Sequence, residues 1–192
     1  MATPAHLALR PEIDAFRQQF EQLASDAGAL VAPLNDEQFA WQSAPAAWSI
    51  AQCLDHLNMT ARAYLPALDE GIAAAIRQGL YGEGPFAYWW LARLFVRTME
   101  PPPRPRMKAP RTFLPPPART RREIMTAFGA YQVQFVDRLR QANGLDLARA
   151  RVRSPVVSWV HMPLGTGFAA MTAHQRRHLW QARKVMHAPG FP

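Results

Sequence analysis

The chain has 192 residues, of which 49% are hydrophobic, and its 22 Lys and Arg against 14 Asp and Glu give a formal net charge of +8 at pH 7. This length and apolar content predict a single domain over residues 1–192 with a sizeable core. The lone cysteine, Cys53, excludes an intrachain disulfide and a zinc site built on several thiolates, and it suits a cytoplasmic location.

The positive charge is concentrated in one segment. Nine Lys or Arg residues and a single acid, Glu100, lie between positions 93 and 122, so this segment carries the whole net charge of the chain. Nearly every base is arginine in a chain also rich in alanine and proline, which a GC-rich coding bias would produce, so no nucleic-acid partner is expected. The longest apolar-rich run, 86–96, is interrupted by Arg93, and the first residues lack a signal-peptide pattern. Neither a membrane span nor a signal peptide is therefore predicted.

Four segments with helical periodicity predict an all-α fold. The first helix is expected at about 11–31, where apolar residues recur at spacings of three and four and Pro11 stands in the first turn. The second is expected at 49–79, where Ser49 and Gln52 form a candidate capping box. Pro66 lies inside this second helix and should bend it.

The third and fourth helices are expected at 120–143 and 165–187. Thr120 and Glu123 form a second candidate capping box, and Asn143 with the following glycine provides a stop signal. On the fourth helix one apolar face includes two histidines that should point inward; its members are Phe168, Met171, His174, His178, Ala182 and Val185.

Two connections separate these helices. Residues 80–118 contain an aromatic run at 86–90 and then a proline-rich stretch that cannot be regular helix or strand. A connection of this length predicts a functional lid, a packed cover or a disordered segment. Another interpretation takes 86–96 and its arginines as an interfacial segment for anionic membranes or nucleic acid, although a buried lid explains the same residues. The second connection, 144–164, is expected to be irregular with a short extended piece at 156–160.

Three histidines are candidate metal ligands. His174 and His178 stand four residues apart, so on a helix both rings project from one side. His56, at the edge of the buried stripe of the second helix, could complete a three-nitrogen site with an open position for water or substrate. The alternative is that they are hydrogen-bonded core histidines. A metalloprotease is disfavoured because Gln175 stands where that helix motif needs a glutamate.

The sequences around these histidines resemble those of DinB-like proteins. The run at 48–57, WSIAQCLDHL, is similar to the start of their second helix, and 174–181, HQRRHLWQ, is similar to their last helix. The resemblance implies a four-helix bundle of up-down-down-up topology, and the long proline-rich connection of this chain then lies between helices 2 and 3. It also implies a metal held by one histidine of the second helix and two of the last, and His56, His174 and His178 fill these positions. Members of the family include thiol transferases that use bacillithiol or mycothiol instead of glutathione.

The resemblance and the open site together suggest a divalent-metal-dependent enzyme, either a thiol S-transferase or a hydrolase in which the metal activates a thiol or water. The alternative is a non-catalytic bundle that binds a metal or a small molecule. Zinc or nickel is expected first, with iron or manganese also suited to nitrogen ligands. The expected partners are a small-molecule substrate, such as a low-molecular-weight thiol, and a second copy in a homodimer.

Several further residues are candidates for the surroundings of the metal. Trp48 and Trp180 either line a pocket or only fill space between helices. Tyr131 is a candidate pocket residue or an ordinary core residue, and Cys53 is expected to form a buried wall. Asp55 and Gln175 adjoin ligands in sequence, but helical neighbours point about 100° apart, so these two are expected at the surface or outside the ligand set.

Overall fold

The computed structural model describes residues 8–45, 47–102, 113–115 and 119–192. In this part of the chain it has six helices and one two-stranded sheet, so the expected all-α character is confirmed. Most of the proline-rich stretch predicted within 80–118 lies outside the described residues. No helix among those described is both long enough and apolar enough to cross a membrane.

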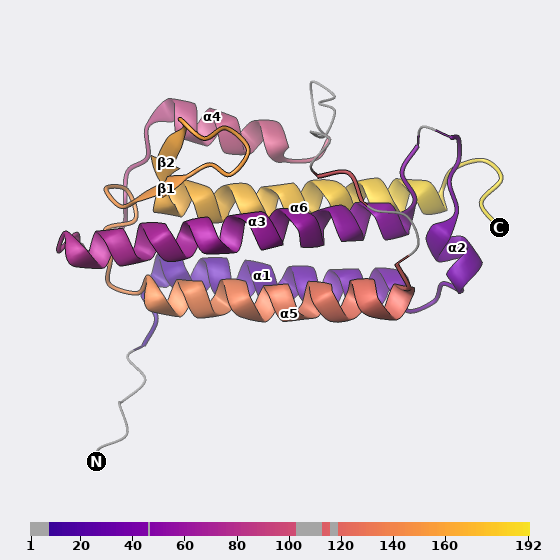
Figure 1. The fold of residues 1–192 in the computed structure, drawn as a ribbon, viewed down its shortest axis with the longest axis horizontal. Coiled ribbons are helices and arrows are strands. Elements are labelled where there is room, and N and C mark those ends of the chain that lie inside the picture. Colours follow the sequence, from indigo (N-terminus) through magenta and orange to yellow (C-terminus); the bar gives the residue numbers. More distant parts are fainter. Residues whose placement is uncertain (1–7, 46, 103–112, 116–118) are drawn as a thin grey trace, which may run out of the picture.

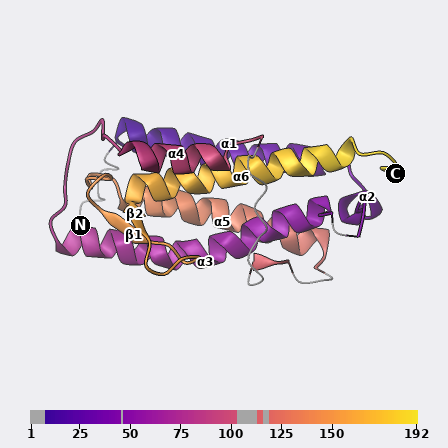
Figure 2. The ribbon, with the colours of Figure 1, turned by 90° about the horizontal axis from the view of Figure 1, so that it is seen from above.

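Four long helices lie side by side and form the body of the molecule (Figure 1). They are α1 (Pro11–Val31), α3 (Ile50–Arg77), α5 (Arg121–Gln141) and α6 (Leu164–Met186). Each was predicted, with ends that differ from the expected ones by two residues at most. Helices α1 and α3 each contact both α5 and α6, and Figure 2 shows the same set from above.

Both candidate capping boxes are present. The Ser49 hydroxyl accepts a hydrogen bond from the Gln52 amide and the Gln52 side chain accepts one from Ser49, which starts α3. Thr120 and Glu123 make the same reciprocal pair at the start of α5. These bonds satisfy backbone amides that have no partner within the helix. Pro66 lies within α3 and does not end it.

The core between the four helices consists of two clusters of buried side chains. One cluster is centred on the second half of α3 and includes Phe20 and Phe135, whose rings stack with centroids 4.7 Å apart. The other surrounds the first half of α3 and includes Leu54, Leu57 and Phe128. The two clusters together cover the apolar stripe of α3 that was visible in the sequence.

The shorter elements were not predicted as such. Helix α2 spans Asp36–Ala40 and helix α4 spans Trp90–Met99, inside the expected connection 80–118. The extended piece expected at 156–160 is wrong, because the two strands flank that stretch: β1 is Arg151–Arg153 and β2 is His161–Pro163. The central residue of each strand, Val152 or Met162, is buried, whereas most of 156–160 is exposed and has no core to face.

Helix α4 lies on α6 and is tied to the bundle at both ends. Before α4, the Tyr88 hydroxyl donates a 2.5 Å hydrogen bond to Glu12 of α1. After α4, the Glu100 carboxylate accepts hydrogen bonds from the Arg176 guanidinium on α6, the shortest at 2.5 Å. The first half of the connection 80–118 is therefore a packed cover on α6.

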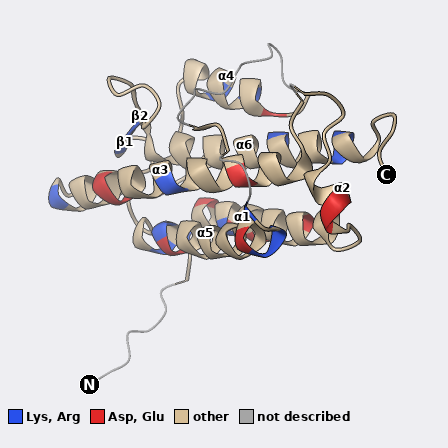
Figure 3. Ribbon diagram, turned by 45° about the vertical axis from the view of Figure 1, so that its right-hand side comes forward, with Lys and Arg blue, Asp and Glu red and all other residues tan. Residues whose placement is uncertain are grey.

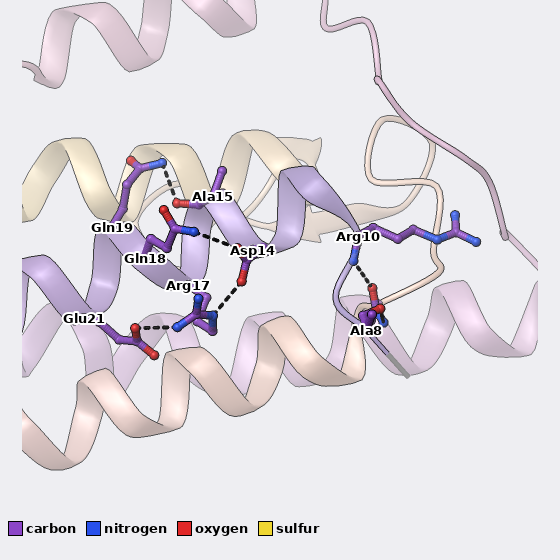
Figure 4. Close-up of polar contacts among 9 residues, drawn as sticks. Ala8, Arg10, Asp14, Ala15, Arg17, Gln18, Gln19 and Glu21 are labelled. Carbon is purple, nitrogen blue, oxygen red and sulfur yellow. Dashed lines mark hydrogen bonds and ion pairs between the residues drawn. The ribbon is translucent and has the colours of Figure 1, made fainter. Parts of the chain in front are cut away.

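The exposed face of α1 carries a chain of polar contacts (Figure 4). Arg17 donates to Asp14 at 2.7 Å and to Glu21 at 2.5 Å, and the Gln18 amide donates to the other oxygen of Asp14. Such pairs, three or four residues apart on a solvated helix, contribute little to stability. The packing of the opposite face therefore holds α1 in place.

Candidate metal centre

The three predicted histidines meet between α3 and α6. His56 lies in the second turn of α3, and His174 and His178 lie on consecutive turns of α6. One ring nitrogen from each lies within 4.8 Å of the other two. The centroid of the His178 ring lies 4.6 Å from the centroid of the His56 ring and 4.6 Å from that of His174. Two helices that are far apart in sequence thus bring three imidazoles to one point.

The distances within the cluster suit a divalent ion. The Nε2 atoms of His56 and His174 are 3.3 Å apart. Two nitrogens that each lie about 2.0–2.1 Å from one tetrahedral zinc ion are separated by roughly 3.3–3.4 Å. The Nδ1 atom of His178 is buried without a hydrogen-bond partner among the described residues. A donor set of three imidazoles with unfilled polar capacity therefore fits a metal ion.

A backbone carbonyl orients His56. The Nδ1 atom of His56 lies 2.7 Å from the carbonyl oxygen of Phe113, which leads toward α5. Because a carbonyl only accepts hydrogen bonds, Nδ1 carries the proton and the lone pair of Nε2 points into the cluster. Ligand histidines are commonly oriented in this way. The role of Phe113 could not be predicted from the sequence, because it acts through its backbone carbonyl, which every residue has.

Burial keeps the three rings neutral. It lowers the pKa of His174 to about 3, with the neighbouring His56 and the Arg177 guanidinium acting in the same direction. Burial also lowers the pKa of His178 well below its usual value, as do the other two histidines and Arg177. The pKa of His56 is lowered by burial, although the Phe113 carbonyl partly opposes that shift. Neutral imidazole is the form that binds metal ions.

The Trp48 ring packs against the cluster, and Cys53 is buried in the core cluster around the first half of α3. The Trp48 ring stacks on His178 with centroids 5.6 Å apart and lies 4.9 Å from His56. Cys53 is fully buried, and burial raises the pKa of its thiol to about 12, so it stays a neutral apolar group. Trp180 is half-buried, with the Lys184 ammonium 4.5 Å above its ring, and its role as a pocket residue stays a prediction.

Tyr131 lies away from these side chains. It is half-buried and packs on the core cluster around Phe20 and Phe135, whereas Trp48 packs on the other cluster. Its predicted part in lining a pocket stays a prediction.

Asp55 and Gln175 are buried and lie outside the ligand set, which is the second of the two placements expected for them. Asp55 is only 2% exposed and accepts a 2.8 Å hydrogen bond from Arg119, while Gln175 is 4% exposed. Each keeps one buried side-chain oxygen without a partner among the described residues. The two residues are buried because α3 and α6 have neighbours on more than one side, which the apolar stripes did not indicate.

An ion pair between Arg119 and Asp55 joins the start of α5 to α3. Arg119 directly precedes the cap of α5, and its partner Asp55 adjoins His56 on α3. Nearby, the Asn58 side chain donates to the Ile124 carbonyl of α5 at 3.0 Å. These contacts fix the start of α5 against the first turns of α3, where the centre lies.

The donor set contains no carboxylate and no thiol. Among the described residues, a group of three or more His, Cys, Asp or Glu side chains close enough to share an ion is found only at His56, His174 and His178. Nitrogen-only ligation suits zinc, nickel, iron and manganese to different degrees and is unlike a calcium or magnesium site.

The family model of the DinB superfamily matches residues 19–182. The match covers most of the chain and spans all three histidines, so the chain belongs to the DinB superfamily. No curated protein and no solved structure matches it.

Proposed function

We propose that this DinB-superfamily chain is a metal-dependent enzyme that transfers a thiol or carries out a hydrolysis at His56, His174 and His178. The observation that carries the proposal is the convergence of three neutral imidazoles within 4.8 Å. A divalent ion held there supplies Lewis acidity, which lowers the pKa of a thiol or water so that a nucleophile exists near neutral pH.

The chain's own residues would hold and orient this centre. The Phe113 carbonyl fixes the tautomer of His56, and the Trp48 ring limits the access of water to His56 and His178. Three neutral ligands would leave the full charge of a divalent ion in place. The Arg177 guanidinium adds positive charge nearby: it lowers the pKa of His174, although burial and His56 lower it more. A site of such positive potential favours an anionic substrate such as a thiolate.

The fold proposed for this function is one domain, residues 1–192, with a four-helix bundle of up-down-down-up topology. Arg10, just before α1, donates to the Gly82 carbonyl after α3 and through its backbone amide to Asn143 after α5. Helix α1 therefore starts where α3 and α5 end. His56, near the start of α3, meets the second half of α6, so α6 ends where α3 starts.

Zinc or nickel is the proposed ion, with iron or manganese as alternatives, since nitrogen donors suit all four and availability decides. A low-molecular-weight thiol is the proposed cosubstrate. A homodimer and a cytoplasmic location complete the proposal, and sedimentation of the purified protein tests the dimer.

A non-catalytic metal-binding bundle is the second candidate function. The observation that favours it is the state of Asp55, the carboxylate next to His56 in sequence, which is buried and bound by Arg119. With its carboxylate engaged in this way, Asp55 is not free to accept a proton from a substrate. Under this hypothesis the metal would only stabilise the helices.

Elemental analysis of the protein purified without a histidine tag tests the centre. We expect one ion per chain in the unmodified protein and none in His56→Ala, His174→Ala or His178→Ala. The matched control is His161→Ala, because His161 lies exposed on β2 outside the cluster. Loss of metal in the control, or retention in all three variants, would refute the site.

Cobalt substitution then separates the two functions. In an enzyme with an open coordination position, added thiol changes the visible spectrum of the cobalt-loaded protein, and turnover disappears with the metal. A visible spectrum that stays the same after thiols or azide are added would support the non-catalytic bundle. Turnover that survives complete metal removal would eliminate the metal-dependent mechanism.

A further inference from the structure

The outer face of α4 exposes large apolar side chains. Trp90 is 57% exposed and Leu94 is 47% exposed, and Leu91 lies beside them with 39%. The opposite side of the helix, with Val96 and Met99, packs against the core. Helical geometry places these two sets on opposite sides of α4. One side thus anchors the helix, while the other presents apolar surface to solvent.

Positive charge accompanies this apolar face. Arg93 and Arg97 are exposed on α4, one turn apart, and 89–99 contains no acidic residue. The next acid along the chain, Glu100, is bound to Arg176. Figure 3 shows basic residues along α4 and an acidic one only at its end. The charge of the arginines is therefore not neutralised by acids on their own helix.

The β1–β2 hairpin lies near the start of α6, on the same side of the bundle as α4. Its loop carries Trp159, which is 82% exposed, and the strand before it exposes Arg151 and Arg153. Residues 151–163 contain no acid either. Figure 1 shows α4 and the hairpin on the side of α6 that faces away from α1 and α5. We call α4 and this hairpin, residues 89–99 and 151–163, the aromatic-basic face.

The aromatic-basic face is held in a fixed position. The bond of Tyr88 to Glu12 anchors the chain before α4, and the bonds of Arg176 to Glu100 anchor the chain after it. Both ties use the inner side of the connection and leave Trp90 exposed. A partner would therefore meet a preformed surface and would not need to order α4 on binding.

We propose that the aromatic-basic face binds the surface of an anionic lipid bilayer. Tryptophan and leucine on one side of a short helix suit the boundary between headgroups and acyl chains, and arginines beside them suit lipid phosphates. A second copy docking the same face would bring Arg93 and Arg97 close to their own counterparts, which like charges oppose. Nucleic acid would match the arginines but would offer no apolar medium for Leu91 and Leu94.

Vesicle co-sedimentation of the full-length protein tests this proposal. The probes are vesicles of phosphatidylcholine alone and vesicles in which a quarter of the lipid is phosphatidylglycerol. We expect binding to the anionic vesicles only, weakened by added salt, with a blue shift of tryptophan fluorescence. Arg93→Ala/Arg97→Ala should weaken binding about 30-fold, from roughly five-fold per arginine near the surface. Trp90→Ala/Leu94→Ala should weaken binding and reduce the blue shift, to which Trp89 and Trp159 also contribute.

Matched variants separate a local face from general charge. Arg62→Ala/Arg77→Ala removes the same charge from exposed positions of α3 and should bind as the unmodified protein does. Equal weakening by both arginine pairs would overturn the proposal. The proposal would also be overturned if the protein bound no vesicles and instead formed a concentration-dependent dimer that Trp90→Ala/Leu94→Ala abolished. A second copy of the chain would then be the partner of this face. Tighter binding of a single-stranded oligonucleotide than of anionic vesicles would overturn it in favour of nucleic acid.

Discussion

Acidification of the metal-free protein should destabilise it through the three clustered histidines. The pKa of His174 is lowered on folding from 6.5 to about 3, chiefly because burial disfavours the charged ring. Between these two values the unfolded state binds more protons than the folded state, so the free energy of unfolding rises with pH. The stabilisation is fully present above pH 6.5 and is lost as the pH falls below it.

The size of the effect follows from these two values. At pH 5 the His174 ring is largely protonated in the unfolded chain and still neutral in the folded one, as its pKa of 6.5 falls to about 3 on folding. Linkage then gives a loss of about 2 kcal/mol between pH 7 and pH 5 from this histidine alone. His56 and His178, whose pKa values are also lowered, chiefly by burial, act in the same direction.

Urea denaturation at several pH values, with a chelator present, measures this loss. The variant His174→Gln should flatten the dependence by about 2 kcal/mol between pH 7 and pH 5, because it removes a titrating ring whose pKa falls to about 3 on folding. His161→Gln, a change on the exposed hairpin, serves as the control. A free energy of unfolding that stays constant from pH 7 to pH 5 would show that the rings are not buried as neutral groups.

Two further changes test the contacts around the bundle. Arg119→Ala leaves the Asp55 carboxylate, 2% exposed, without its partner. Because Arg119 is partly solvated, we expect the free energy of unfolding in urea to fall by only about 1–3 kcal/mol. An unchanged free energy of unfolding would mean that water replaces the guanidinium. Gly165→Ala would place a methyl group 1.9 Å from the Tyr88 hydroxyl oxygen. The free energy of unfolding of this variant should fall by about 1–3 kcal/mol, which thermal unfolding would show as a lower melting temperature. Gly129→Ala, where nothing lies within 4 Å, should instead stabilise α5 by about 0.5–1 kcal/mol. If both glycine variants lost similar stability, the close contact between Gly165 and Tyr88 would be contradicted.

The sequence was sufficient to predict the four long helices because each carries a continuous apolar stripe. Capping boxes at Ser49 and Thr120 fixed two of their starts. Helix α4 escaped prediction, since its apolar residues occupy both sides and the proline-rich stretch that follows suggested an irregular connection. Its position depends on Arg176 and Glu12, side chains that belong to other helices.

The three histidines were predictable for a different reason. A polar residue within an apolar helical stripe must have a partner, and the spacing of His174 and His178 placed two such residues side by side. The contact of His56 with the Phe113 carbonyl was beyond the sequence, as it depends on how the chain returns toward α5. The burial of Asp55 was missed because its partner, Arg119, lies far along the chain.

One turn of α6 serves both the candidate centre and the cover. His174 and His178 face α3, while Arg176, between them in sequence, points toward α4 and binds Glu100. Arg176 also donates to Gln19 of α1 at 2.9 Å. The residues that would hold a metal and the residue that fixes α4 therefore share one rigid helical turn. This turn therefore connects α4 with the helix that carries His174 and His178.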